Sequence, residues 1–432
     1  MYALVDCNSF FCSVERLFHP GLHNSPVCVL SSNDGCIVAL TPEAKKVGLR
    51  RGDPLFKVID IVRNNNVRVF SGNIRLYAAM SKRVVSILRH SVHHVENYSI
   101  DESFCDLRGY EAHCDLETMM RNIANRIVQW TDIPVSVGVA PTKTLAKMGS
   151  KFAKTYPGYR SVCMIDTDDK RRKALSMFAL DDVWGIGRHT LNRLTYYGIH
   201  TPLQFADKSE TWVRTHLHKP GVQTWLELNG TDCIDTAERL RHQTICTSRS
   251  FGTKISDLAS LQSSVATFAS SCAGKLRSQH SVASAVTVFL CAGCAYESNE
   301  SDPNVAEPDE SVSNMATTTL IVPTSDTIEI TAAALRALVA IYRPGICYRK
   351  SGVILGSITS ATSVQTDLFD TIGCRPQRSC LMNAIDSINL RYGPKTVHLG
   401  IADDRLQQWR AKGEYRSPDY LTDINQIPVI HI

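Results

Sequence analysis

The sequence predicts a multidomain α+β protein, and three observations support this prediction. The chain has 432 residues, which at about 150 residues per domain corresponds to roughly three domains, each able to bury its own core. Its 44% hydrophobic and 21% charged residues are ordinary globular values, which exclude a coiled coil and a mostly disordered chain. Strand-like runs and amphipathic helical segments also follow one another along the chain.

The first domain extends to about residue 165 and mixes strands with helices. Residues 1–6 (MYALVD) form an apolar run that ends at a carboxylate, and residues 134–140 (PVSVGVA) form a run rich in β-branched side chains. Both runs predict short strands. Apolar residues at helical spacing predict helices over 74–90 and 115–130, so this part has an α/β or α+β architecture.

Two more domains and a tail follow. Polar and basic residues 166–174 precede a short helical region that extends to about residue 240 and predicts a small helical domain. The next segment predicts a sheet with two helices, with strands over 244–252, 283–291, 318–322 and 352–358 and helices over 257–277 and 331–342. A Ser/Thr-rich stretch after residue 358 opens a tail that regains helical spacing at 380–391.

Composition favours a cytoplasmic protein with reduced thiols. No run approaches the roughly 18 apolar residues of a membrane-spanning helix, and Asp6 stands where a signal peptide would continue its apolar stretch. The 15 cysteines are odd in number and scattered through apolar segments, which favours buried thiols over disulfides. The CxxC pair Cys291–Cys294 is also interpreted as buried thiols and not as a zinc site. The acidic segment 295–314 is interpreted as a solvated loop.

Three carboxylates stand where strands are expected to end. Asp6 closes the first strand, and Asp101 and Glu102 lie within YSIDESF (98–104), whose apolar flanks predict a strand or hairpin. Adjacent acids point to opposite faces of a strand, but at a turn or strand end both can approach one cation together with a third acid. Two Mg²⁺ ions acting on a phosphate group need several such oxygen ligands. Taken alone, however, these residues fit ordinary strand ends better than a metal site.

Four lysines share one face of a predicted helix in TKTLAKMGSKFAK (142–154). At about 100° per residue they stand at about 0, 40, 80 and 20°; they are Lys143, Lys147, Lys151 and Lys154. Leu145, Met148 and Phe152 fall on the opposite face, so the helix is expected to bury that side and present the lysines. The net charge of +5 is only a slight bias, but this stripe contains no acid and favours a polyanionic partner. An ordinary surface helix explains it equally well.

Residues 180–203 (LDDVWGIGRHTLNRLTYYGIHTPL) have a helix-hairpin-helix pattern. The turn is formed by Gly185, Ile186 and Gly187, and apolar Leu191 and Leu194 follow at helical spacing. Glycines allow the backbone to approach a phosphate, and the N–H groups at the start of the next helix can bind it. The pattern favours binding of the DNA backbone without sequence preference over a purely structural turn.

Several motifs stand in one order along the chain. Asp6 is followed by Asn8 and Phe11, then by YSIDESF, SVGVAPTKTLAKMGSKFAK and the Trp184-Gly185-Ile186-Gly187 hairpin. In this order the chain resembles the Y-family translesion DNA polymerases, most closely those of the UmuC type. LSSNDGCIVAL (30–40), GDPLF (52–56), QTDLF (365–369) and YRSPDY (415–420) extend the resemblance over essentially the whole chain.

The resemblance implies a right-hand DNA polymerase that copies damaged templates with low accuracy in DNA repair and SOS mutagenesis. Its parts would be a palm (1–11 and 71–170), small fingers (12–70), a helical thumb (171–240), a little-finger domain (241–358) and a C-terminal tail (359–432). Its substrates would be primer-template DNA and deoxynucleoside triphosphates. Two Mg²⁺ ions would be held by Asp6, Asp101, Glu102 and the backbone carbonyl of Cys7.

The resemblance also implies roles for residues around these carboxylates. Phe11, five residues after Asp6, resembles the steric gate that rejects a 2′-hydroxyl, although without the resemblance it would be a core residue beside Phe10. Lys45 and Lys154 match positions that hold the incoming triphosphate, Ser99 matches a residue that supports the acidic pair, and the DNA-binding candidates are Gly185, Ile186, Gly187, Lys143 and Lys147. Many relatives carry Tyr where Pro42 stands and Arg where Lys45 stands, and Lys offers a point charge instead of a planar fork.

The expected partners bind outside this centre. Gln365, Leu368 and Phe369 in QTDLF follow the Ser/Thr-rich linker and resemble a sliding-clamp binding motif. The resemblance further implies a UmuD-type dimer and a RecA-type filament as partners, with no membrane. Two alternatives remain: a non-catalytic DNA-damage scaffold, which would tolerate loss of the acids, and a nucleotide cyclase, which has no use for a DNA-binding hairpin.

Overall fold

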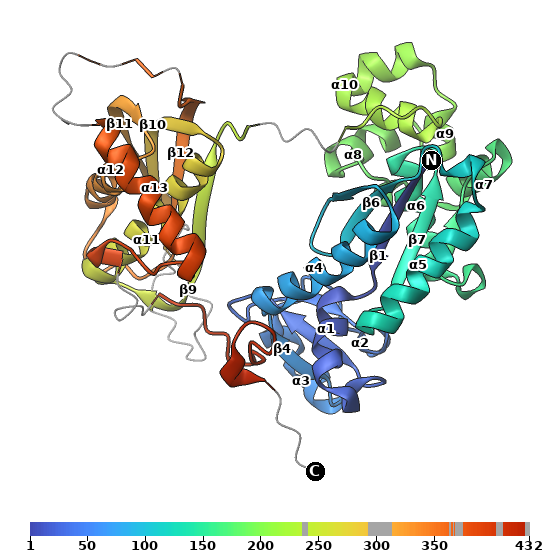
Figure 1. Ribbon diagram of the computed structural model, residues 1–432, viewed down its shortest axis with the longest axis horizontal. Coiled ribbons are helices and arrows are strands. Elements are labelled where there is room, and N and C mark those ends of the chain that lie inside the picture. Colours follow the sequence, from blue (N-terminus) through green and yellow to red (C-terminus); the bar gives the residue numbers. More distant parts are fainter. Residues whose placement is uncertain are drawn as a thin grey trace, which may run out of the picture. The chain divides into compact units, whose positions relative to one another are not determined.

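The computed structural model describes residues 1–235, 241–292, 313–362, 364–365, 367, 375–402 and 409–427. The chain divides into two compact units, one formed by Met1–Arg239 with Glu414–Ile432 and the other by Leu240–Gly413. Sheets and helices are combined in both units (Figure 1), which confirms the α+β class. In the described part of the chain, no helix has the length and apolar character needed to cross a bilayer.

A five-stranded sheet forms the centre of the first unit, in the order β5-β6-β1-β7-β8. Its middle strand β1 (Tyr2–Cys7) is antiparallel to both neighbours, β6 (Glu102–Asp106) and β7 (Val135–Ala140). β5 (His94–Asn97) and β8 (Val162–Met164) form the edges. The strands expected at 1–6 and 134–140 are therefore the middle strand β1 and its neighbour β7.

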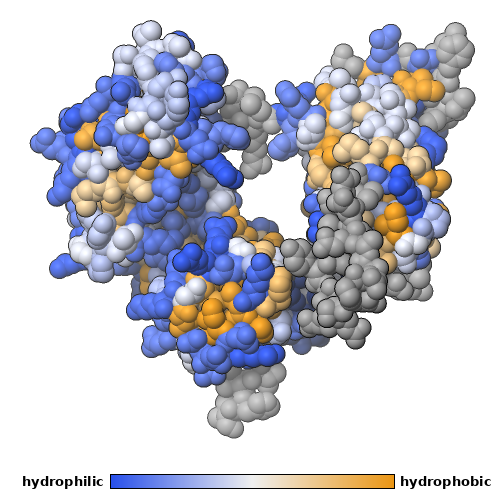
Figure 2. Space-filling model, turned by 180° about the vertical axis from the view of Figure 1, so that it is seen from behind, coloured by the Kyte–Doolittle hydropathy of each residue, from blue (hydrophilic) through white to orange (hydrophobic). Residues whose placement is uncertain are grey.

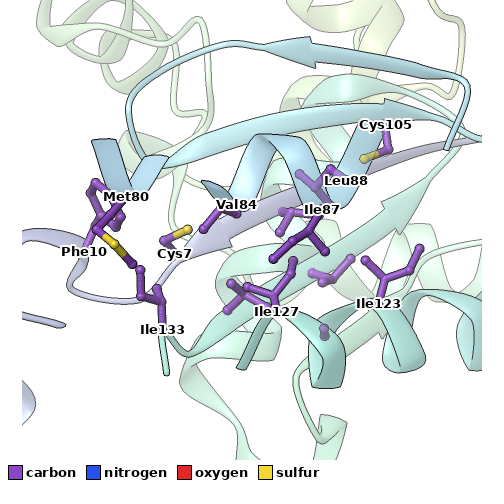
Figure 3. Packing of buried hydrophobic residues seen from close by; sticks show 14 of the residues in the cluster. Cys7, Phe10, Met80, Val84, Ile87, Leu88, Cys105, Ile123, Ile127 and Ile133 are labelled. Atoms are coloured by element: carbon purple, nitrogen blue, oxygen red, sulfur yellow. The ribbon is translucent and has the colours of Figure 1, made fainter. Parts of the chain in front are cut away.

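Alternate residues of β1 enter two different cores, because successive side chains of a strand point to opposite faces. Ala3, Val5 and Cys7 pack with α4 (Ile74–Ser91) and α5 (Leu116–Thr131), as Figure 3 shows for part of this core. Leu4 packs with α6 (Lys143–Thr155) on the other face. Asp6 stands two residues after Leu4, so its carboxylate lies on the α6 face.

A smaller sheet follows β1 in the sequence. It has the order β3-β2-β4, with β2 (Val27–Leu30), β3 (Ile37–Leu40) and β4 (Arg68–Ser71). α2 (Pro42–Lys46) and α3 (Leu55–Asn64) contribute to its own core. α1 (Phe10–Phe18) connects the two sheets, since its buried residues share one core with residues of both β1 and β2.

Four helices continue the core on the α6 face. They are α7 (Asp168–Met177), α8 (Arg188–Tyr196), α9 (Pro202–Ala206) and α10 (Glu210–Leu228), within the segment where a helical region was expected. α10 is kinked at His218, whose φ of 56° is not helical, two residues before Pro220. The kink is the expected consequence of proline, which cannot continue the helical hydrogen bonds.

The second unit contains a four-stranded antiparallel sheet in the order β11-β10-β12-β9. Its strands are β9 (Ile245–Ile255), β10 (Ser281–Ala292), β11 (Ser313–Thr324) and β12 (Tyr348–Ser360), and its core includes α11 (Leu258–Ser278) and α12 (Thr327–Ile341). The sheet with two helices expected here is present. Hydrophilic residues cover much of the face shown in Figure 2, with apolar patches between them.

The described residues after β12 are divided between the two units. Helix α13 (Arg375–Tyr392) is held on the second unit by the ion pairs Arg277–Asp386, Arg375–Glu329 and Arg378–Asp326. Trp409 is buried against Phe268 of the same unit. From Glu414 onward the chain belongs to the first unit.

Candidate active site

The pairing of β1 with β6 brings the predicted carboxylates to one end of the central sheet. Asp6 lies directly opposite Glu102 in this antiparallel register, so both side chains are on the same face of the sheet. The backbone N–H of Cys7 donates to the carbonyl of Asp101 at 2.9 Å, which fixes the turn before β6 beside the end of β1. The hairpin expected for YSIDESF is formed by β5, this turn and β6.

Ser99 holds the turn that carries the acidic pair. Its hydroxyl donates to Asp101 Oδ1 at 2.6 Å and accepts from the backbone N–H groups of Asp101 and Glu102 at 3.2 and 3.0 Å. These bonds orient Asp101 and close the turn without a bulky side chain. The contact agrees with the supporting position that the resemblance assigned to Ser99.

Helix α6 supplies the positive charge that faces these acids. Lys147 Nζ lies 2.8 and 3.0 Å from the two carboxylate oxygens of Glu102, and Lys154 Nζ lies 3.2 and 3.3 Å from those of Asp6. The helix approaches β7 at Gly138, where a Cβ would lie 2.0 Å from the carbonyl oxygen of Ala146. Glycine is required here because no side chain fits between strand and helix.

The lysine stripe is therefore not an exposed cationic surface over its whole length. Lys143 is buried, with 5% of its surface exposed, and its ammonium lies 2.9 Å from Glu96. Lys151 pairs with Asp182. The expectation that the stripe is presented to solvent is wrong for Lys143, because β5 and the segment before α8 bring carboxylates that the helix sequence does not contain. Leu145, Met148 and Phe152 are buried as expected.

Burial raises the pKa of Asp6 above its ordinary range. Lys154 opposes this shift, and the charges of Glu102 and Asp101 add to it. The pKa of the Cys7 thiol is also raised by burial, so the sulfur stays protonated within the apolar core and only the backbone carbonyl is suited to a hard cation. Among the described residues, no three His, Cys, Asp or Glu side chains are already gathered around one point. Asp6 and Glu102 contact lysines of α6 instead.

The two residues expected to contact the nucleotide from α1 and α2 lie in different settings. Phe11 is half-buried and stacks on Tyr77, with ring centroids 4.5 Å apart and an interplanar angle of 17°. Lys45 is exposed on α2, whose N-terminus is capped by Thr41. Of the two candidate triphosphate lysines, Lys154 is the one that contacts a carboxylate of the site.

The hairpin of the helical region has the predicted glycine turn and following helix, but the element directly before the turn is only a three-residue 3-10 helix, Leu180–Asp182. Gly185 has a φ of 96°, a conformation that favours glycine, and Ile186 is buried. Gly187 is the N-cap residue of α8. Because glycine has no side chain, no capping side chain accepts a hydrogen bond from the first N–H groups of this helix. Trp184 packs edge-on against Tyr98, which connects the hairpin to the turn that carries the acids.

Sequence reasoning missed two buried residues behind Phe11. Glu15 is fully buried on α1, and Tyr77 of α4 donates to its Oε1 at 2.6 Å. The available signal was the spacing, because Glu15 follows Phe11 by four residues and therefore shares its helix face.

Part of the clamp-motif prediction lies outside the described residues. Gln365 is described and exposed, whereas Leu368 and Phe369 are not described. The same holds for Cys294 of the CxxC pair and for most of the acidic segment 295–314.

Comparison with known families divides the chain into three matched segments. Residues 5–151 match the impB/mucB/samB family, and residues 242–368 match the C-terminal domain of that family. Residues 379–430 match a domain of unknown function, DUF4113.

Full-length relatives and solved structures agree with these matches. The chain is 37% identical over 98% of its length to Protein UmuC of Salmonella typhimurium, 98% of which is covered. It is 36% identical to Protein MucB of Escherichia coli, with both chains covered in full. A Y-family DNA polymerase chimera of Dbh and Dpo4 superimposes with a TM-score of 0.62 at 20% identity, over 83% of this chain and 99% of that one. This last likeness shows the fold.

Proposed function

This chain belongs to the impB/mucB/samB family and is a UmuC-type Y-family DNA polymerase, and from this premise we propose that it performs error-prone synthesis past damaged template bases in SOS mutagenesis. It extends a primer with deoxynucleotides by nucleotidyl transfer. The observation that carries the proposal is the pairing of Asp6 with Glu102 across neighbouring strands, with Asp101 in the adjoining turn.

Asp6, Asp101, Glu102 and the Cys7 carbonyl are the proposed ligands of two Mg²⁺ ions. Their oxygen atoms suit a hard cation. Burial is the main cause of the raised pKa of Asp6, and the charges of Glu102 and Asp101, which add to it, are charges that a cation would stabilise. When bound, such a pair of ions activates the primer 3′-hydroxyl and stabilises the charge that develops on the leaving pyrophosphate. Ser99 contributes by holding Asp101 in the orientation described above.

Lysines bind the triphosphate of the incoming nucleotide in this proposal. Lys154 lies 3.2 Å from Asp6 and keeps 38% of its side chain exposed, so its ammonium can reach a phosphate beside the carboxylates. Lys45 on α2, the helix that packs against the small sheet, provides a second positive charge for the triphosphate. Lys147 orients Glu102 through its two hydrogen bonds.

Phe11 is the proposed sugar gate. Its ring is supported from one side by Tyr77, so it cannot move aside without breaking this stack. A 2′-hydroxyl on the incoming sugar would collide with a ring held in this way, and the enzyme would therefore prefer deoxynucleotides.

The DNA duplex is bound by backbone contacts at the hairpin Gly185–Gly187, and Lys147 is a further candidate only if its ammonium leaves Glu102. The glycine turn and the uncapped start of α8 support this, since N–H groups at a helix start bind phosphates. Lys143 stays a candidate only if its ammonium leaves Glu96. The proposed palm, fingers, thumb, little finger and tail keep the boundaries expected from the sequence.

The proposed partners are a sliding clamp, a UmuD-type dimer and a RecA-type filament, and the proposed location is the cytoplasm, where the DNA is. Gln365, exposed after β12, is consistent with an accessible clamp motif. A short motif of this kind raises the concentration of the polymerase at the primer end.

Primer extension across a template with an abasic site tests the proposal. We expect products longer than the position of the lesion when Mg²⁺ is present and none when it is chelated. A chain that binds primer-template DNA but never extends it, on damaged or undamaged templates, would support the scaffold alternative instead.

A further inference from the structure

The C-terminal segment from Glu414 to Leu421 is bonded to the first unit along its length. Glu414 N–H donates to Asp34 at 2.7 Å, and Ser71 exchanges two hydrogen bonds with Tyr415, its N–H donating to the carbonyl at 3.0 Å and its hydroxyl accepting at 2.9 Å. Tyr420 stacks on Phe18 of α1 with ring centroids 4.6 Å apart. These contacts pack the segment onto the rest of the first unit. The segment lies in the part of the chain that matches the domain of unknown function.

The middle of this segment reaches a buried acid. Ser417 is 6% exposed, and its hydroxyl donates to Oε1 of the fully buried Glu15 at 3.0 Å. The side chain of Asn73 fixes the serine from the other side by donating to its carbonyl at 3.0 Å. The second carboxylate oxygen of Glu15 is buried without a partner. Glu15 therefore depends on few donors, and losing one of them has a large effect on its position.

The same acid is bonded to the residue that supports the sugar gate. Tyr77 donates to Glu15 Oε1 at 2.6 Å, and its ring stacks on Phe11. Phe11 and Glu15 are one helical turn apart on α1, so Tyr77 contacts two successive positions of the same helix face. The order of contacts is Ser417, Glu15, Tyr77 and Phe11.

We infer that the C-terminal segment Glu414–Leu421 positions the sugar gate, with Ser417, Glu15 and Tyr77 acting as positioning residues for Phe11. The inference rests on the proposed role of Phe11. It gives the domain of unknown function a part in sugar selection, because a gate discriminates only as far as it is held in place. Without the segment, Glu15 loses a donor and its cover, and the tyrosine that supports the gate is less constrained.

The test compares ribonucleotide and deoxyribonucleotide insertion, as the ratio of kcat/KM for CTP and dCTP opposite a template guanine. Tyr77→Phe keeps the stacked ring and removes only the hydroxyl, and Ser417→Ala removes the donor of the C-terminal segment. Glu15→Leu removes the shared acceptor, whereas Glu15→Gln keeps an oxygen that can accept both bonds. We expect the ratio to rise about three- to tenfold in the first three variants and to stay near the wild-type value in Glu15→Gln.

Matched controls come from helix α13, in the same C-terminal domain but on the second unit. Ser387→Ala and Tyr392→Phe change the same groups at exposed positions and should leave the ratio unchanged. A purely structural role would lower insertion of both nucleotides together and leave their ratio constant. Should Glu15→Leu not fold, Tyr77→Phe and Ser417→Ala carry the comparison.

Phe11→Ala separates failure of the inference from failure of the proposed gate. If Phe11→Ala raises ribonucleotide use but Tyr77→Phe and Ser417→Ala match wild type in ratio and Tm, the inference is overturned and the gate stands. If Phe11→Ala itself leaves the ratio unchanged, the gate assignment is wrong and the inference falls with it.

Discussion

Asp6 and Glu102 face each other across antiparallel strands, and each is bound by a lysine of the same helix, Lys154 and Lys147 respectively. The two lysines are seven residues apart, which is close to two turns of α6, so one helix face serves both acids. The lysines of α6 thereby stabilise the negative charges of Asp6 and Glu102 at the end of the sheet. Where a lysine does not fully offset the cost of burying a carboxylate, the folded state is less stable.

Asp6→Asn should raise Tm near neutral pH. Burial raises the pKa of Asp6, so the folded protein binds its proton more tightly than the unfolded chain does. The contribution of such a group to stability is present below the ordinary Asp pKa of about 3.9 and is lost as pH rises through the folded-state pKa. The gain in Tm should therefore shrink as the pH is lowered toward the ordinary value, which thermal denaturation over a pH series measures.

Asp106, at the other end of β6, provides the opposite case. Burial raises its pKa, but the hydrogen bonds and charge of Arg108 outweigh this effect and hold the pKa below the ordinary range. Its contribution is present above the ordinary pKa and lost as pH falls, so Asp106→Asn should lower Tm near neutral pH. If Asp6→Asn and Asp106→Asn shift Tm in the same direction and by the same amount, burial does not raise the pKa of Asp6.

The two hairpin glycines should separate folding from DNA binding. A Cβ at Gly185 would lie 2.3 Å from Thr224 Oγ1, and its φ is positive, so Gly185→Ala should lower the free energy of unfolding by about 1–3 kcal/mol. At Gly187 nothing lies within 4 Å of a Cβ, so Gly187→Ala should keep the wild-type Tm. We expect the added methyl group, which projects into open space, to keep a phosphate away from the N–H groups at the start of α8 and to weaken primer-template binding about fivefold. If Gly187→Ala binds primer-template DNA with wild-type affinity, the hairpin is a structural turn that does not bind DNA.

Lys143→Met should reduce stability and not DNA affinity. It removes the partner of Glu96 at a buried position and two contacts of the ammonium with the rings of Tyr2 and Phe104. Lys143 is buried, but Glu96 keeps 23% of its side chain exposed, so the cost of leaving Glu96 unpaired is about 1–3 kcal/mol. Lys151→Met is the matched control, since that lysine is half-exposed and its ion pair should contribute less than about 1 kcal/mol. If Lys143→Met has the wild-type Tm but binds DNA more weakly, Lys143 contacts DNA.

Local periodicity was enough to predict many of the elements, but not how they pair. The apolar runs at β1 and β7 and the helical spacing of α4, α5 and α6 are visible in single segments. The register that sets Asp6 against Glu102 depends on two strands about a hundred residues apart, and only motif resemblance indicated that they belong together. The carboxylates that bury Lys143 and pair Lys151 come from other elements as well.

The return of the C-terminal segment was beyond local reasoning for the same cause. Ser417 and Glu15 are separated by 402 positions in the sequence. YRSPDY stood out only through the family resemblance, and a polar motif after a helix favours an exposed tail when no partner is known. Its burial follows from the buried Glu15, which needs donors that α1 itself does not provide.

Replacing Leu368 and Phe369 together with Ala should remove stimulation of synthesis by the sliding clamp. The two side chains are the expected apolar anchors of the motif, and Gln365 would fix its register. Extension on short primers without clamp should be unchanged. Leu390→Ala is the matched control, because this leucine is 89% exposed on α13 and outside the motif. Equal stimulation of the double variant and wild type would refute the motif.

Nucleotide addition depends, in the proposed function, on Asp6 near the end of β1, Asp101 in the turn before β6 and Glu102 at the start of β6. Primer extension by Asp101→Ala and Glu102→Ala, beside Asp106→Ala from the far end of the same strand, tests this dependence most directly. We expect the first two variants to bind primer-template DNA as wild type does but to add no nucleotide, while Asp106→Ala extends the primer. Extension at the wild-type rate by either Asp101→Ala or Glu102→Ala would contradict it.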